Sequence, residues 1–140
     1  MQNVEVLHLK ITVPPDAARL CSLREHVYRL CEVEGVPAQT TRLMVVAIDE
    51  AVSNIIEHAN LGTTKNEIEL SLEIGDNKIV ATICDHGKPF DPRHSRKEPD
   101  RASFPRRGFG LYLIHKIVDY LEYERTSEGQ NKLTLTKSIA

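Results

Sequence analysis

The chain has 140 residues and lacks the features of several large classes of protein. No apolar run approaches the ~20 residues of a membrane-spanning helix. The first residues, "MQNVEVLHLKITVPP", alternate and carry an acid early, unlike a signal peptide. A formal net charge of -2 argues against a general nucleic-acid or membrane-surface binder, which is normally basic. We therefore expect no direct contact with nucleic acid or membrane.

Cysteine is also scarce. Cys21, Cys31 and Cys84 form no CxxC pair and leave one odd thiol in any disulfide scheme. Reduced thiols in a cytoplasmic protein are the simplest interpretation. The six histidines lack the spacing of a zinc site, which predicts no structural metal. The Walker A sequence GxxxxGK[ST] and the eukaryotic kinase catalytic signature are absent too, so any nucleotide site must be of another kind.

The composition, with 41% hydrophobic and 27% charged residues, is that of one globular domain, which we expect to span residues 1–140. Its periodicities predict both strands and helices. In chain order these are a strand over 4–13, helices over 16–35 and 38–60, strands over 67–74 and 78–85, a long segment without period over 87–107, a helix over 108–121 and two strands around "SEGQN". This order predicts the α+β class, as a two-layer α/β sandwich. We expect a mostly antiparallel, mixed sheet with its helices on one face.

Three polar clusters interrupt this regular pattern. In "VVAIDEAVSNIIEHAN", residues 45–60, Glu50 and Asn54 lie four positions apart in an otherwise apolar helix. At roughly 100° per residue they lie only about 40° apart on the helix surface. A solvent-exposed stripe is the ordinary explanation, and a polar site that faces a ligand is the functional one.

The second cluster follows the strand "KIVATICD". Ile79, Ala81 and Ile83 alternate onto one face, and the same alternation places Asp85 with them, under the helical layer. An ionised carboxylate in that place is costly without a partner. Alternatively, the strand ends at Cys84 and Asp85 opens a turn, as Asp often does before Gly.

The third cluster is "RRGFGLYL", residues 106–113. Gly108 and Gly110 precede a predicted helix, whose free N–H groups and positive dipole end can hold phosphate. Glycines before a helix are more often only a flexible entry. In the same way, a solvated basic pair is a commoner explanation of Arg106 and Arg107 than a phosphate clamp.

Taken together, "DEAVSN" on a helix, "DHGKPF" after a strand and "RGFGL" opening a helix occur in the order of the N, G1 and G2 boxes. These boxes mark the Bergerat, or GHKL, ATPase fold of gyrase, heat-shock chaperones, histidine kinases and mismatch-repair ATPases. Over nearly its whole length the chain most resembles the bacterial anti-sigma-factor serine/threonine-protein kinases.

The resemblance implies a role for each cluster. Asn54 would coordinate the Mg²⁺ that bridges the ATP phosphates, and Glu50 would act as general base. Asp85 would accept a hydrogen bond from the adenine amino group, and Gly87 would let the backbone approach the base. The implied cofactors are ATP and Mg²⁺.

The third cluster would complete the ATP site. Residues 87–107 would form a lid over the nucleotide. The further ATP-binding residues implied by the resemblance are Arg107, Gly108, Gly110 and Leu111.

The chain also departs from the family at two places. Pro89 stands where the general pattern has a second glycine, although a "PFDP" ending is familiar in the anti-sigma kinase branch. Asn131 and Lys132 begin the last strand, where relatives often have threonines near the nucleotide.

As a function, the resemblance implies an ATP-dependent serine kinase that phosphorylates a STAS-type anti-sigma antagonist and sequesters a sigma factor. The family also commonly forms homodimers. One alternative is a module that binds ATP and sequesters a partner without kinase activity. Another is an ATPase fragment of a larger machine, which fits a chain of this length poorly. Glu50 favours the kinase, because a pure binding module needs no carboxylate beside Asn54.

Overall fold

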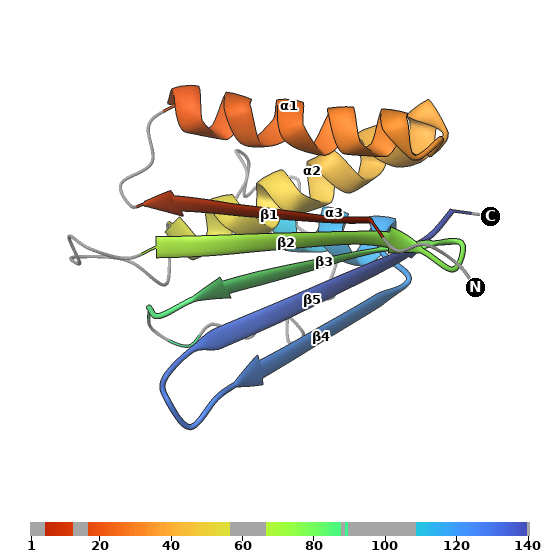
Figure 1. Ribbon diagram of the computed structural model, residues 1–140. Helices are drawn as coiled ribbons and strands as arrows, with labels where there is room; N and C mark the ends of the chain where they lie inside the picture. The colour runs from red at the N-terminus through yellow and green to blue at the C-terminus, as the bar shows by residue number, and fades with distance from the viewer. Residues whose placement is uncertain (1–4, 13–16, 57–66, 88, 90–108, 140) are drawn as a thin grey trace.

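The computed structural model describes residues 5–12, 17–56, 67–87, 89 and 109–139 (Figure 1). Its elements in chain order are β1 (Glu5–Thr12), α1 (Ala17–Val33), α2 (Ala38–Asn54), β2 (Glu67–Gly75), β3 (Lys78–Asp85), α3 (Phe109–Ile117), β4 (Tyr120–Arg125) and β5 (Asn131–Ser138). The strands form one sheet in the order β1-β2-β3-β5-β4, and each neighbouring pair is antiparallel. Figure 1 shows the three helices on one face of this sheet, which confirms the predicted α+β two-layer architecture.

Alternation along β2 and β3 sets which side chains face the helices. The inward-facing residues of both strands are buried: Ile68, Leu70, Leu72, Ile74, Ile79, Ala81 and Ile83. The turn between the strands has Asp76 and Asn77 at φ of 53° and 60°, as a type I′ turn requires. This turn fixes the register of the hairpin, and with it the face onto which each later residue of β3 points.

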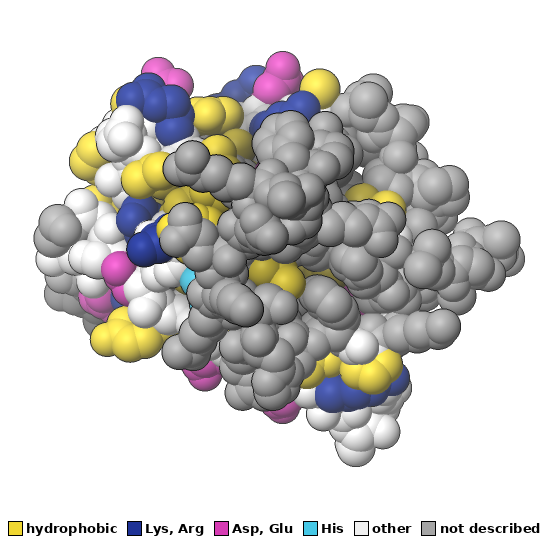
Figure 2. Space-filling view, turned by 180° about the vertical axis from the view of Figure 1, so that it is seen from behind, with side chains coloured by type: hydrophobic (Ala, Val, Ile, Leu, Met, Phe, Trp, Pro, Cys, Tyr) yellow, Lys and Arg dark blue, Asp and Glu magenta, His cyan; other side chains and the backbone are white. Residues whose placement is uncertain are grey.

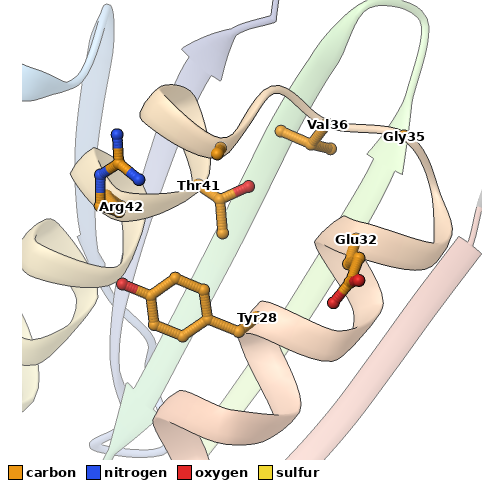
Figure 3. A pocket seen from close by; sticks show the side chains of 7 residues that line it. Tyr28, Glu32, Gly35, Val36, Thr41 and Arg42 are labelled. Carbon is orange, nitrogen blue, oxygen red and sulfur yellow. The ribbon is translucent and has the colours of Figure 1, made fainter.

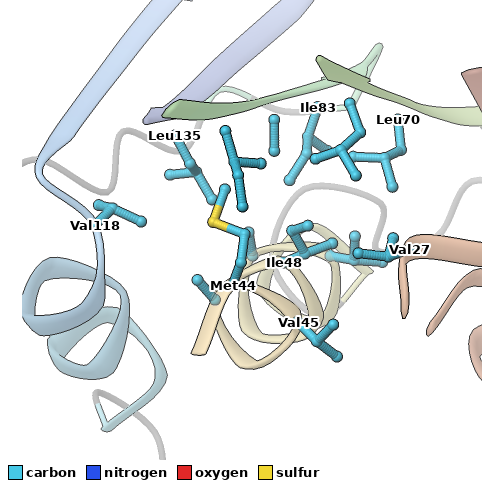
Figure 4. Close-up of a cluster of buried hydrophobic side chains, with 14 of the residues drawn as sticks. Val27, Met44, Val45, Ile48, Leu70, Ile83, Val118 and Leu135 are labelled. Atoms are coloured by element: carbon cyan, nitrogen blue, oxygen red, sulfur yellow. The ribbon is translucent and has the colours of Figure 1, made fainter. Parts of the chain in front are cut away.

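Helix α2 supplies much of the core between the two layers. Met44 and Ile48 point from α2 toward the sheet, where Leu135 and Ile83 lie, and Val27 of α1 belongs to the same buried cluster (Figure 4). No atom of Met44 is exposed to solvent. The face of α2 that binds the sheet is thereby filled with apolar atoms, which leaves the polar positions of the helix to its other faces.

We predict that Met44→Ala lowers the free energy of unfolding by about 2–5 kcal/mol, because it removes buried methylene groups and leaves a cavity. Urea unfolding followed by circular dichroism would measure this loss. The matched control on the same helix is Val46→Ala, whose side chain is 39% exposed. It should change stability by no more than about 0.5 kcal/mol. A loss for Met44→Ala that is no larger than for the control would contradict the assigned core.

The ends of the helices differ in part from the sequence-based expectation. Gly35, at φ of 75°, follows α1 as the predicted stop, and the N–H of Val36 donates to the carbonyl of Cys31 at 2.9 Å. The helix predicted to reach residue 60 is regular to Asn54 and continues as one wider turn at residues 55 and 56. Its last predicted residues, 57–60, lie outside the described ones.

The helix predicted over 108–121 is too long at its C-terminal end. Helix α3 ends at Ile117, and Tyr120 already belongs to β4. The N–H of Asp119 donates to the carbonyl of Thr136 in β5 at 2.8 Å, and Lys137 Nζ donates to the carbonyl of Ile117 at 2.9 Å. Pairing with β5 therefore prevails over the helical pattern. None of the described helices is both long enough and apolar enough to cross a bilayer.

Candidate functional site

Glu50 and Asn54 lie on the last turns of α2, and both side chains are half-buried. Four residues of helix separate them by about 6 Å along the axis. The Nδ2 atom of Asn54 is buried and has no hydrogen-bond partner among the described residues. A buried donor without a partner costs about 1–3 kcal/mol. Such a group is typical of a site that is completed by a ligand.

The two neighbouring carboxylates at this end of α2 have different surroundings. Asp49 accepts a hydrogen bond and ion pair from Arg24 Nη1 of α1 at 2.9 Å. Burial raises the pKa of Glu50, and the charge of Asp49 raises it further. Burial thus makes Glu50 a better proton acceptor than an exposed glutamate, which suits a general base.

Asp85 ends β3 and is only 2% exposed, so its side chain does face inward as the alternation predicted. Its Oδ2 accepts hydrogen bonds from the N–H of Gly87 at 2.8 Å and from Asn131 Nδ2 at 3.2 Å. Burial raises the pKa of Asp85, and these hydrogen bonds together with the charges of His86 and Arg125 oppose that rise. The strand therefore continues through Asp85 rather than ending at Cys84, and the Gly87 contact shows that Asp85 also closes a local turn.

Sequence reasoning missed a network of side chains around Asp85. Asn131 Oδ1 accepts from the Tyr123 hydroxyl at 2.6 Å and from Arg125 Nη1 at 2.8 Å. The Gly87 carbonyl accepts from Arg125 Nη1 and Asn131 Nδ2, both at 3.1 Å. Alternation in "NKLTLT" could have placed Asn131 on the inward face, but the pairing of β4 was needed to find the other two residues.

The start of α3 carries the remaining described candidates. Gly110 lies in the first turn, where helix N–H groups are free of intrahelical partners. The Leu111 side chain is buried in the core. Arg107 and Gly108 lie outside the described residues, and of the predicted lid the structure describes only Gly87 and Pro89.

The elements that carry these residues come together in the fold. Helix α3 packs against α2, and Figure 1 shows α2 and β3 ending at the same edge of the molecule. The structure therefore brings Asn54 and Asp85 to one edge from different layers. Within the described ranges no three His, Cys, Asp or Glu side chains cluster as a metal site. A magnesium ion that is held by phosphates, water and one amide oxygen requires no such cluster.

A cavity of about 420 Å³ lies elsewhere, between α1 and the start of α2 (Figure 3). Tyr28 and Glu32 line it from α1, and Thr41 and Arg42 line it from α2. Twelve residues of helix separate Arg42 from Asn54, or about 18 Å. This cavity is therefore not part of the site near Asn54.

Charged side chains are mixed on the face seen in Figure 2. Among the described residues of this face, Lys and Arg alternate with Asp, Glu and hydrophobic side chains, without a field of one sign. This distribution agrees with the small net charge of -2.

The chain matches the model of the histidine kinase-like ATPase domain over residues 13–137. The serine-protein kinase RsbW of Bacillus cereus is 28% identical over 146 aligned positions, which cover 99% of this chain and 88% of that protein. The counterpart from Oceanobacillus iheyensis is 25% identical over 126 positions, 85% of this chain and 78% of that protein. The serine/threonine-protein kinase BtrW of Bordetella bronchiseptica is 31% identical over 100 positions, 69% of this chain and 70% of that protein.

Solved structures agree with the fold. The RsbU and RsbW domains of a Mycobacterium tuberculosis protein match with a TM-score of 0.68 at 18% identity, covering 96% of this chain and 32% of that longer chain. The SiaB–SiaC complex of Pseudomonas aeruginosa matches with a TM-score of 0.57 at 14% identity, over 96% of this chain and 91% of the matched chain. Such low identities show the fold alone. The family model and the kinase relatives show that this chain belongs to the histidine kinase-like ATPases and, among them, to the bacterial anti-sigma-factor serine/threonine-protein kinases.

Proposed function

We propose that residues 1–140 form one ATPase domain that acts in the cytoplasm as a protein serine kinase and anti-sigma factor. It transfers the γ-phosphoryl group of ATP to a serine of a STAS-type antagonist, and it sequesters a sigma factor until unphosphorylated antagonist displaces it. Family membership and the kinase names of the relatives support the activity. The matched SiaB–SiaC structure is a protein complex, which supports a role in which this fold binds a protein partner.

The observation that carries the proposal is the buried amide of Asn54, whose Nδ2 lacks a partner among the described residues. A phosphate oxygen would accept from this donor, while the amide oxygen is the kind of ligand that Mg²⁺ takes. When bound, Mg²⁺ would neutralise charge on the phosphates. Asn54 would hold it there, with Gly110 and the Leu111 backbone near the phosphates.

Glu50 would supply the proton transfer. A serine hydroxyl is a weak nucleophile at neutral pH, and a positioned carboxylate can take its proton as the phosphoryl group moves. Desolvation raises the pKa of Glu50, which makes it a better acceptor for that proton. Asp85 would accept from the adenine amino group, and Gly87 would let the backbone approach the base.

Assembly into a homodimer is part of the proposal. Among the described strands, β1 lies at the edge of the sheet and pairs with β2. The side chain of Val6 in this strand is 54% exposed to solvent. An edge of this kind can add a further strand from a second copy.

Incubation with labelled ATP and purified STAS-domain proteins from the same genome tests the proposal. Mg²⁺-dependent label on one such protein, and release of a bound sigma factor by its unphosphorylated form, is the expected result. Nucleotide binding and sigma-factor release without label on any of them would instead identify a sequestration module. Absence of nucleotide binding would refute the assigned site.

We predict that Asp85→Asn weakens ATP binding by tenfold or more and relaxes the preference for adenine over guanine. An amide donates as well as accepts, so the site would no longer offer only an acceptor. Loss of one hydrogen bond to a charged group is worth roughly tenfold in affinity. Calorimetric titration with ATP and GTP measures both effects, and Asp76→Asn in the exposed turn is the matched control. Equal affinities for the variant and the wild type would show that Asp85 is only a turn residue.

A further inference from the structure

The side-chain amide of Asn131 uses all of its hydrogen-bonding capacity. Its Oδ1 accepts from Tyr123 and from Arg125, and its Nδ2 donates to Asp85 and to the Gly87 carbonyl. An amide has two acceptor positions and two donor hydrogens. Asn131, which is itself buried, is therefore held in one orientation by partners on both sides.

Hydrogen bonds from Asn131, together with those from Gly87 and Arg125, occupy two acceptor atoms at the end of β3. Asp85 Oδ2 accepts from the N–H of Gly87 and from Asn131, and the Gly87 carbonyl accepts from Arg125 and Asn131. Each oxygen has two lone pairs, so both atoms are saturated. The other carboxylate oxygen, Oδ1, takes no part in these contacts. A ligand that donates a hydrogen bond to Asp85 must therefore donate to Oδ1.

Charge strengthens this arrangement. Arg125 brings its guanidinium to Asn131 Oδ1 at 2.8 Å, which polarises the amide and strengthens its donation to Asp85. A threonine hydroxyl at position 131 would have one hydrogen, so it could not donate to Asp85 and to Gly87 together. The asparagine amide has two donor hydrogens and can therefore make both hydrogen bonds.

We propose that Asn131, oriented by Tyr123 and Arg125, is a positioning residue that sets base selectivity. It fills Oδ2 of Asp85 and the carbonyl of Gly87, so that of the described acceptors on Asp85 and Gly87 it leaves a purine Oδ1. A base with an exocyclic amino group at this position is bound, and a base with a carbonyl there is rejected. This inference rests on the proposed ATP site and states how that site would distinguish adenine from guanine.

The test compares Asn131→Thr with Lys132→Thr, which introduces the same residue at the neighbouring exposed position on the other face of β5. Calorimetric titration gives the affinities for ATP and GTP. The ratio of the two should fall about tenfold in Asn131→Thr, the effect of one hydrogen bond to a charged group, and stay unchanged in Lys132→Thr. A merely structural role would weaken both nucleotides equally and leave the ratio as it was, which would overturn the inference.

A second measurement does not require nucleotide. Carboxyl NMR of the free protein should show a higher pKa for Asp85 in Asn131→Thr, because a donor that favours the ionised form is weakened. The charged groups that act on Asp85 from its own segment and from β4, His86 and Arg125, are the same in both proteins. An unchanged pKa would contradict the assigned contact.

If Asn131→Thr does not fold, Arg125→Met and Arg125→Lys decide the matter. The methionine removes the hydrogen-bond donor and the charge, so it should lower the ratio of ATP affinity to GTP affinity. The lysine keeps the charge and can still donate to Asn131, so it should keep this ratio near the wild-type value. Equal selectivity in both variants would refute the proposal. If the wild type binds no ATP, the proposed function fails as a whole. If it binds ATP selectively and all three variants do so as well, the role of Asn131 alone fails.

Discussion

Glu50→Gln should bind ATP and partner proteins as the wild type does, yet lose roughly 10²–10⁴-fold in the rate of phosphoryl transfer to the STAS antagonist. Glutamine keeps the shape of the side chain and removes its ability to take the serine proton. Single-turnover transfer of labelled phosphate, with calorimetric binding of ATP in parallel, separates the two effects. Transfer near the wild-type rate would assign the base to another group.

The pH dependence of the same reaction gives an independent check. A general base works only when it is deprotonated, so transfer is lost as the pH falls through the pKa of Glu50. Burial, and then the charge of Asp49, raise that pKa. The acid limb of the profile should therefore lie above the ordinary range of a glutamate, and it should be absent from the residual activity of Glu50→Gln. An acid limb retained in that variant would belong to another residue.

Asn54→Ala should abolish Mg²⁺-dependent binding of ATP and leave the fold intact. Its Nδ2 is buried without a partner among the described residues, so removing it takes no described contact from the fold. It would remove both the proposed metal ligand and a donor to phosphate. Calorimetric titration with and without Mg²⁺ measures the binding, and circular dichroism checks the fold.

The matched control for Asn54 is Ser53→Ala, one position earlier on the exposed face of α2. This variant should bind ATP as the wild type does, with the same gain from added Mg²⁺. Unchanged nucleotide affinity in Asn54→Ala would remove the assignment of this helix end to the metal and phosphates. A loss in both variants would indicate a general effect on the end of the helix.

Much of the fold follows from short-range pattern in the sequence. The alternation of Ile68 to Ile74 and the Asp76–Asn77 turn predict a hairpin because side-chain period and turn geometry act locally. The alternation of Ile79, Ala81 and Ile83 likewise placed Asp85 on the buried face. The boundary after Ile117 could not be predicted in this way, because the residues that follow suit a helix until β5 is there to pair with them.

The residues of the site also differ in whether the sequence alone could identify them. Glu50 and Asn54 share one helix, so their common stripe was visible from spacing alone. The partners of Asp85 come from β4 and β5, and the identity of Asn131 as one of them depends on the pairing of Asp85 with Asn131 across the sheet. Contacts between distant strands are set by the whole fold rather than by neighbouring residues, so the network around Gly87 became evident only in the structure.

The pairing of β3 with β5 has a consequence for how the chain acquires its ligand. Asp85 and Asn131 meet across a separation of 46 residues, and contacts of such long range form slowly during folding. A chain in which β5 has not yet joined the sheet lacks the Asn131 contact to Asp85, and with it part of the proposed base site. A nucleotide that uses this proposed site would therefore bind the native state in preference to any such intermediate. In the cell, saturation with ATP would then draw newly made chains toward completion of the sheet.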